Sequence, residues 1–184
     1  MILKNGLIIE NNKLIKKDIL IVDGKILEIR DEINGDDVID CTNLLIMPGA
    51  VDVHVHLREP GYEYKETIKT GTLSAAKGGV TTIMPMPNLN PCPDTLEHLN
   101  VQLEKLKNDS LVNAYPYASV TVAEKGNQAS DLDDLCKEVY GITDDGVGVN
   151  NIQLLINGMQ KAKEYDVVMA SHAEDLVDSK LPQG

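Results

Sequence analysis

The pattern of apolar and polar residues divides the chain into two parts with different rhythms. Before residue 48 there are four short runs rich in Ile, Leu and Val, at 2–9, 19–22, 26–30 and 37–40. The dipeptides between them are Asn11-Asn12, Asp23-Gly24 and Asn34-Gly35. Apolar runs separated by turn dipeptides are typical of neighbouring β-strands. The pattern therefore predicts a small β-rich domain over residues 1–48.

After Pro48-Gly49 the pattern changes to strands that alternate with helices. Strands are expected near 51–56, 80–86, 112–120, 140–143 and 167–171, and helices near 63–77, 95–108, 131–138 and 151–165. Each strand and its helix take about 30 residues, as a βα repeat does. In the second helix, Asp94 followed by Glu97 resembles a capping box, which marks a helix start. Residues 49–184 are therefore predicted to form a parallel α/β domain.

Residues with metal-binding chemistry lie at the end of the first of these strands. Successive strand residues point to opposite faces, so His54 and His56 share one face with Val55 between them. Two imidazoles on one face can bind one metal ion. An isolated His-x-His also occurs in cores and on surfaces, so this interpretation depends on what lies nearby.

Other strand ends carry similar residues. The second strand is followed by Asn88, the fourth by Asp144 and Asp145, and the fifth by His172. In a parallel βα barrel these ends meet on one face, where ligands bind. The sequence has no G-x-G-x-x-G or phosphate-binding loop, so a barrel is favoured over a doubly wound sheet. Two simpler interpretations remain, an ordinary turn at Asp144-Asp145-Gly146 and a surface position for His98 on a charged helix.

Composition narrows the classes of partner. The chain has 17 basic and 29 acidic residues and a net charge of −12, without a basic cluster, so we expect no nucleic-acid partner. No apolar run reaches about 20 residues, and the N-terminus lacks the apolar stretch of a signal peptide. We therefore expect no membrane association and a cytoplasmic location. The three cysteines form no C-x-x-C, which indicates reduced structural thiols, with Cys136 on a buried helix face.

Three segments together resemble one enzyme family. They are PGAVDVHVHLREPGYEYKETIKTGTLSAAKGGVTTIMPMPN, TDDGVGV and SHAED. They resemble the dihydroorotases of the longer bacterial type, in the amidohydrolase superfamily. The resemblance implies a (β/α)8 barrel of the TIM type that holds two zinc ions. It also implies interconversion of N-carbamoyl-L-aspartate and L-dihydroorotate in pyrimidine biosynthesis.

The resemblance assigns roles to individual residues. It implies that His54 and His56 bind one zinc ion, that Asp145 bridges both ions and that His172 binds the second ion. The family's spacing to His172 favours Asp145 over Asp144 as the bridging carboxylate.

The resemblance also implies that Arg58 and Asn88 bind the substrate carboxylate, to which a guanidinium is well matched. The simpler alternatives are an ion pair between Arg58 and Glu59, and a turn at Asn88 between Pro87 and Pro91.

The length of the chain limits these expectations. A complete eight-fold barrel takes roughly 250 residues, and residues 49–184 supply just over half of that, up to about the fifth strand. The family's later zinc-binding histidine and its acid/base aspartate have no counterpart here. We therefore expect an N-terminal part of a dihydroorotase that is inactive alone.

Two rival functions remain open. One is a related dihydropyrimidinase or allantoinase. The other is a non-catalytic relative that assembles with itself or with aspartate transcarbamoylase.

Overall fold

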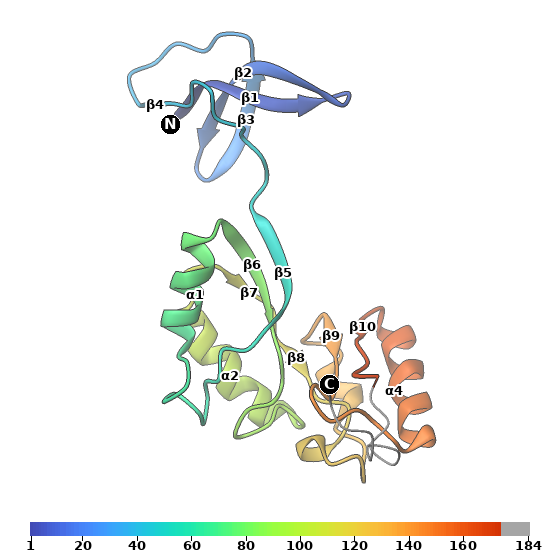
Figure 1. The fold of residues 1–184 in the computed structure, drawn as a ribbon. Coiled ribbons are helices and arrows are strands. Elements are labelled where there is room, and N and C mark those ends of the chain that lie inside the picture. The colour runs from blue at the N-terminus through green and yellow to red at the C-terminus, as the bar shows by residue number, and fades with distance from the viewer. Residues whose placement is uncertain (174–184) are drawn as a thin grey trace, which may run out of the picture. The chain divides into compact units, whose positions relative to one another are not determined.

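The computed structural model describes residues 1–173, and the chain divides into two compact units, Met1–Pro48 and Gly49–Gly184 (Figure 1). The first unit contains one four-stranded sheet with the order β3-β2-β1-β4. Its strands β1, β2 and β3 are antiparallel neighbours, whereas β4 pairs with β1 in parallel. The strand bounds are β1 Ile2–Glu10, β2 Lys13–Val22, β3 Lys25–Arg30 and β4 Val38–Asp40.

Turn dipeptides account for two of the three connections in this sheet. Asn11 and Asn12 have φ of 50° and 59°, and Asp23 and Gly24 have φ of 51° and 72°. Two successive left-handed residues are what a two-residue hairpin of the I′ type requires, and Asn, Asp and Gly adopt them most easily. The third dipeptide, Asn34-Gly35, does not form a hairpin. It lies in a longer loop, because β4 pairs with β1 and not with the strand before it.

A buried carboxylate in this unit accepts hydrogen bonds from two backbone amides. Asp18 on β2 is 1% exposed and accepts hydrogen bonds from the backbone amides of Asn5, at 2.8 Å, and Ile33, at 2.9 Å. Burial by itself would raise the pKa of Asp18, but the two amides, together with the positive charges of Lys4 and Lys16, outweigh it and hold the pKa below its ordinary value of 3.8. The charged form of Asp18 therefore stabilises the fold.

This shift predicts how the stability of the unit depends on pH. A carboxyl with a depressed folded pKa stabilises the fold above its unfolded pKa, and that stability is lost as pH falls through the folded pKa. The free energy of unfolding of the wild type should therefore decrease below about pH 4 more steeply than that of Asp18→Asn. Denaturant unfolding of both proteins over this range measures the difference, and parallel pH profiles would contradict the assignment.

The second unit is a parallel α/β structure, as the sequence predicted. Its strands form two three-stranded sheets with the orders β5-β6-β7 and β8-β9-β10, and every pairing is parallel. The strand bounds are β5 Ala50–Val55, β6 Val80–Pro85, β7 Asn113–Ala114, β8 Tyr117–Ala118, β9 Gly141–Ile142 and β10 Val168–Met169.

The expected single strand over 112–120 is in fact two short strands. Tyr115-Pro116 separates β7 from β8, so β7 pairs with β6 while β8 pairs with β9. Pro116 has no N–H to donate to a sheet ladder, which explains a break at this point. One stretch of chain thus belongs to both sheets, and neighbouring strands follow the order of the sequence.

Four helices connect these strands, and their bounds differ in part from the predicted ones. α1 begins five residues later than expected, where the Thr67 hydroxyl caps the helix. The helix predicted over 131–138 is a single turn. None of the helices within residues 1–173 combines the length and hydrophobicity needed to cross a bilayer. The helix bounds are α1 Ile68–Lys77, α2 Leu96–Asp109, α3 Leu132–Leu135 and α4 Ile152–Tyr165.

The start of α2 corrects two predictions. Thr95, not Asp94, caps the helix, by accepting a hydrogen bond from the His98 amide at 3.2 Å. Asp94 is instead buried, where it accepts a hydrogen bond from the Ala123 amide at 2.9 Å and contacts His98 Nδ1 at 2.6 Å. The His98 side chain is therefore only 40% exposed and takes part in local packing, so its prediction as a surface residue was only partly right.

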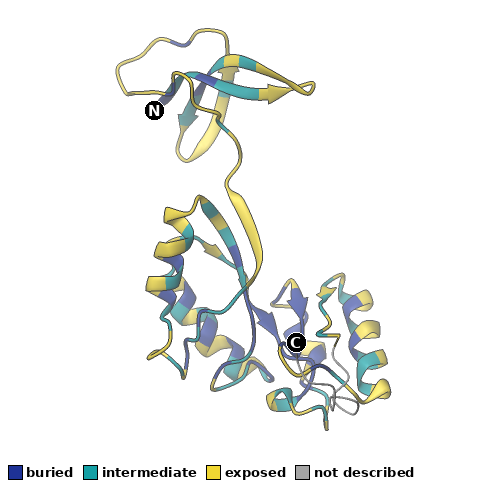
Figure 2. Cartoon of the chain, viewed as in Figure 1, coloured by how far each residue is buried: buried dark blue, intermediate teal, exposed yellow. Residues whose placement is uncertain are grey.

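The apolar interior of the second unit consists of two clusters of buried side chains (Figure 2). The larger cluster joins α2, α3 and α4 to β8 and β9. It contains Cys136, which is 3% exposed as predicted but directly follows α3 instead of lying on its face. The smaller cluster lies between α1, α2 and β6. Members of the larger cluster are Leu99, Ala118, Val120, Leu132, Leu135, Cys136, Val139, Ile142 and Ala162, and those of the smaller are Leu57, Ile68, Ile83 and Leu106.

Candidate metal site

Two histidines stand at the carboxyl end of β5. His54 lies in the strand, and His56 follows its last residue, Val55. Strand alternation places both imidazoles on one side, and their ring centroids are 5.2 Å apart in an edge-to-face arrangement. The side chains of His54 and His56 are 54% and 30% exposed, so a ligand could reach both rings.

The third member of the group arrives from the end of β9. Asp145 is 8% exposed, and its two carboxylate oxygens face different histidines. Oδ1 lies 3.4 Å from His54 Nε2, and Oδ2 lies 3.5 Å from His56 Nε2. One ligand atom from each residue lies within 4.8 Å of the others. Residues about 90 positions apart in the sequence therefore meet in one potential chelating group.

The spacing of these atoms suits a metal ion better than direct hydrogen bonds. Nitrogen–oxygen hydrogen bonds are about 2.7–3.2 Å long. Two ligand atoms that each lie about 2.0–2.2 Å from one tetrahedral zinc ion are about 3.3–3.5 Å apart. Two imidazoles and a carboxylate are also ligand types that zinc accepts. The residues present therefore fit a divalent metal ion.

Asn88, at the end of β6, links the members of the site. Its Nδ2 donates to Asp145 Oδ2 at 2.9 Å, and its Oδ1 lies 3.0 Å from His56 Nδ1. Because an amide oxygen can only accept, the proton of neutral His56 belongs on Nδ1 in this contact. That tautomer leaves the lone pair of Nε2 available to a metal, which is the usual arrangement around metal-binding histidines.

Arg58 also reaches Asn88, from a turn that follows the strand. β5 ends at Val55, and Arg58 itself adopts a left-handed backbone with φ of 61°. From this turn its Nη1 donates to Asn88 Oδ1 at 3.3 Å. Among residues 1–173, no carboxylate lies within ion-pair distance of Arg58. The guanidinium therefore lies beside the candidate metal group, and no carboxylate of residues 1–173 pairs with its charge.

The alternative ion pair between Arg58 and Glu59 is wrong, because Glu59 has other partners. Glu59 is buried and accepts hydrogen bonds from the Ile68 amide at the start of α1 and from Lys105 on α2, both at 2.8 Å. The hydrogen bond to Glu59 raises the pKa of Lys105. Glu59 thus anchors the turn that carries Arg58 to two helices.

Removing the cation from this anchor should destabilise the protein. Lys105→Met leaves the nearly buried Glu59 charge with only the Ile68 amide, so we expect the free energy of unfolding to fall by about 1–3 kcal/mol. Lys107→Met is the matched control, because Lys107 is exposed on the same helix. Denaturant unfolding compares the two variants, and equal losses would show that the Glu59 contact contributes nothing.

The structure distinguishes the two adjacent aspartates. Only Asp145 faces the histidines, whereas the Asp144 carboxylate is buried against the backbone of Val120 and Thr121. The chain does turn at these residues, because the Gly148 amide donates to the Asp144 carbonyl at 3.2 Å and Gly146 has a φ of 84°. The turn interpretation is therefore right for the backbone, but both aspartate side chains also have specific partners.

A third carboxylate near the site was missed in the sequence. Glu124 belongs to a 3-10 turn, Val122–Glu124, in which Ala123 and Glu124 both have left-handed backbones. The turn brings the Glu124 carboxylate towards Asp145, whose backbone amide partly stabilises its charge. Burial, together with the neighbouring Asp144 and Asp145, nevertheless raises the pKa of Glu124 to about 8. Ala123 and Glu124 are not glycines, so the sequence did not predict a left-handed bend at these two positions.

His172 does not join the group of three. It follows β10 and is half-buried, but it is not among the residues whose ligand atoms lie within 4.8 Å of one another. Its role as ligand of a second ion stays a prediction. The last two residues of the SHAED segment lie outside the described residues.

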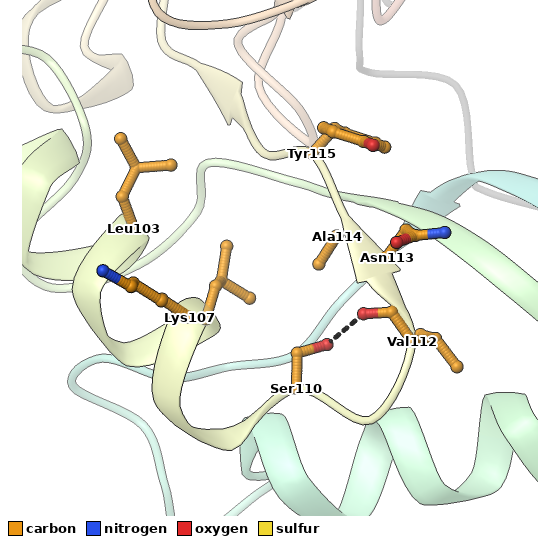
Figure 3. A pocket seen from close by; sticks show the side chains of 8 residues that line it. Leu103, Lys107, Ser110, Val112, Asn113, Ala114 and Tyr115 are labelled. Carbon is orange, nitrogen blue, oxygen red and sulfur yellow. Dashed lines mark hydrogen bonds between the residues drawn. The ribbon is translucent and has the colours of Figure 1, made fainter. Parts of the chain in front are cut away.

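A separate hollow lies between the end of α2 and β7 (Figure 3). Its volume is about 330 Å³, and the Ser110 hydroxyl at its rim donates to the Val112 carbonyl at 2.7 Å. None of the candidate site residues lines it, so we assign it no role in the site. The lining residues are Leu103, Leu106, Lys107, Ser110, Val112, Asn113, Ala114 and Tyr115.

Sequence comparisons identify close relatives of the chain. The family described as dihydro-orotase-like matches residues 43–180. A dihydroorotase of Fusobacterium nucleatum is 44% identical over 177 residues, which cover 95% of this chain and 42% of the relative. A dihydroorotase of Bacillus cereus is 45% identical over 177 residues, which cover 94% and 41%. The chain thus spans about two fifths of the length of these relatives.

Solved structures show a similar fold. An L-hydantoinase (dihydropyrimidinase) from Arthrobacter aurescens superposes with a TM-score of 0.78 at 24% identity, over 91% of this chain and 39% of that one. A D-hydantoinase (dihydropyrimidinase) from Thermus sp. has a TM-score of 0.70 at 26% identity, over 91% and 39%. The path of the backbone is therefore shared with these two hydantoinases.

Proposed function

The chain belongs to the dihydro-orotase-like family, and we propose that it is the N-terminal, metal-binding part of a zinc-dependent dihydroorotase. The observation that carries this proposal is the meeting of His54, His56 and Asp145, with Arg58 and Asn88 beside them. The hydrolase family is shown by the sequence relatives. Because the chain covers only about two fifths of their length, the activity of a whole enzyme is part of the proposal.

The fold supports assigning residues 49–184 to the first five strands of an eight-stranded barrel. In such a barrel neighbouring strands follow the order of the sequence. The strands β5 to β10 do so, and they make five if the short strands β7 and β8 are counted as one. Apolar side chains are exposed at both ends of this series, with Val51 and Val53 on β5 and Val168 on β10. Further βα units packed at these ends would bury such side chains.

The candidate ligands define how metal would be held. His54 and His56 would bind one zinc ion through Nε2, and Asp145 would bridge to a second ion that also binds His172. Bound zinc polarises an amide carbonyl and lowers the pKa of a bound water molecule to about 7. Asn88 keeps the His56 proton on Nδ1 and restrains the Asp145 carboxylate, so both ligands are oriented before metal arrives.

Arg58 and Asn88 would bind the substrate. L-dihydroorotate carries a carboxylate, and the guanidinium of Arg58 can donate two parallel hydrogen bonds to it. The carboxylate would then fix the ring with its amide next to the metal group. The family resemblance places a further ligand histidine and the acid/base aspartate on later strands, which these 184 residues do not include. We therefore infer that the chain binds metal but needs those later strands for turnover. We also expect the protein to be located in the cytoplasm.

Two alternatives make different predictions. The first alternative is a related dihydropyrimidinase or allantoinase. The shared fold is consistent with a dihydropyrimidinase, but the segment around Arg58 resembles the dihydroorotases. A non-catalytic relative that assembles with itself or with aspartate transcarbamoylase would have no use for metal ligands. Substrate preference separates the first alternative from our proposal, and metal content separates the second.

The test has two stages. Zinc bound by the purified 184-residue chain is measured first by competition with a coloured chelator. The chain is then combined with the C-terminal remainder of the Fusobacterium nucleatum dihydroorotase, and turnover of dihydroorotate is compared with that of dihydrouracil, hydantoin and allantoin. We expect zinc binding by the chain alone and turnover of dihydroorotate by the combination. Absence of zinc binding, or preference for another ring, would refute the proposal.

A further inference from the structure

Asp144 is held in place by contacts that have no direct role in metal binding. Its carboxylate is 2% exposed, and Oδ1 accepts hydrogen bonds from the amides of Val120, at 2.8 Å, and Thr121, at 3.0 Å. The Thr121 hydroxyl donates to Oδ2 of the same carboxylate. All three donors come from the segment that directly follows β8. The carboxylate therefore connects the end of β9 to the end of β8.

The Asp144 contacts lie just beyond the point where backbone pairing between β8 and β9 ends. β8 pairs with β9 up to Ala118 and Ile142, and the last backbone bond runs from the Thr143 amide to the Ala118 carbonyl at 2.9 Å. Beyond it, the amides of Val120 and Thr121 are buried, with both residues 0% exposed. Buried amides need an acceptor. The Asp144 side chain supplies one where the strand itself no longer does.

The hydrogen bonds of Asp144 matter for the metal group because the next residue in the chain is a candidate metal ligand. Asp145 is the next residue, so the position of its Cα follows directly from where Asp144 is fixed. The Asp145 carboxylate has different neighbours, His54 and His56. Thr121 is itself restrained, because its hydroxyl oxygen accepts the Gly126 amide at 2.9 Å. The chain can shift little at Asp145 without breaking several buried hydrogen bonds.

We propose that Asp144 and Thr121 are positioning residues that hold the Asp145 carboxylate between the two histidines for metal binding. This inference rests on the proposed function, because it concerns the same metal group. Partners behind a metal ligand typically change metal affinity by 10–100-fold. If the Asp144 and Thr121 contacts served stability alone, their loss would leave the zinc affinity of the folded chain unchanged. Zinc affinity therefore distinguishes a positioning role from a purely structural one.

The experiment measures zinc affinity and the visible spectrum of bound Co²⁺ in the 184-residue chain. Thr121→Val removes the hydroxyl at constant shape, and Thr121→Ser restores it. We expect Thr121→Val to weaken zinc binding about 10-fold and to alter the Co²⁺ absorption, which reports ligand geometry. Thr121→Ser should resemble the wild type. Circular dichroism verifies that each variant is folded.

Asp18→Asn is the matched control for a purely structural effect. Asp18 is equally buried and also accepts two backbone amides, but it lies in the N-terminal unit. It should lower stability and leave zinc affinity unchanged. If Thr121→Val fails to fold, Asp144→Asn is measured in the same way, since it keeps an acceptor for both amides.

The outcomes distinguish the positioning role of Thr121 and Asp144 from metal binding by the chain. Zinc affinity equal to that of the wild type in folded Thr121→Val, or in folded Asp144→Asn if it takes that place, overturns the positioning role and leaves the proposed function intact. Failure of the wild-type chain to bind zinc overturns the proposed function and the positioning role with it.

Discussion

Replacing Asp145 with alanine should lower the affinity of the chain for zinc by at least about 100-fold, the upper end of what is lost when only a partner behind a ligand is removed. The carboxylate is the only acidic member of the group, and its two oxygens face the two imidazoles at 3.4 and 3.5 Å. Without it, His54 and His56 alone offer two neutral nitrogens. Zinc affinity is measured by chelator competition at fixed pH.

Two further variants define the cause of that loss. Asp145→Asn keeps the shape of the side chain and an acceptor for Asn88, so it isolates the contribution of charge. Asp134→Ala removes an exposed aspartate on α3, whose side chain is 62% exposed, and should bind zinc like the wild type. Wild-type affinity in Asp145→Ala would mean that the three residues do not form the metal site.

The second large effect concerns the core. Leu99→Ala should lower the free energy of unfolding by about 2–5 kcal/mol, because Leu99 is 0% exposed and packs at the centre of the larger cluster. A loss of that size is a large share of the roughly 5–15 kcal/mol that stabilises a typical domain. The cluster joins three helices to β8 and β9, so no single neighbour can fill the space.

An exposed leucine provides the comparison. Leu73 lies on α1 and is 57% exposed, so Leu73→Ala should change stability by less than about 1 kcal/mol. Urea unfolding followed by circular dichroism measures both variants. Similar midpoints for the two would contradict the assignment of Leu99 to a packed core.

Regular features of the fold could be predicted because each rests on a short-range rule. Strand alternation placed His54 and His56 together, and the alternation of strands and helices gave the parallel α/β class. The Asn and Asp-Gly turns were recognised from the left-handed conformations that these residues tolerate. The convergence of strand ends predicted that the Asp144-Asp145 pair would lie near the histidines, and the family resemblance favoured Asp145.

Other features depend on contacts that no local pattern contains. The bend that carries Glu124 towards Asp145 needs left-handed backbones at Ala123 and Glu124, which neither residue favours. Arg58 reaches Asn88 from a similar left-handed turn. Asp94 resembled a helix cap, but tertiary contacts gave its carboxylate to Ala123 and His98. These tertiary contacts of Glu124, Arg58 and Asp94 could therefore be identified only from the structure.

If the chain binds metal and a substrate carboxylate as proposed, the amide of Asn88 makes the two binding equilibria thermodynamically dependent on each other. One oxygen contacts both Arg58 and His56, and the nitrogen of the same group contacts Asp145. A carboxylate ligand that draws the guanidinium towards itself acts on the amide that orients two metal ligands. By linkage, whatever factor an anion adds to metal affinity, metal must add to anion affinity. A single uncharged side chain is thus the point at which the two equilibria are joined.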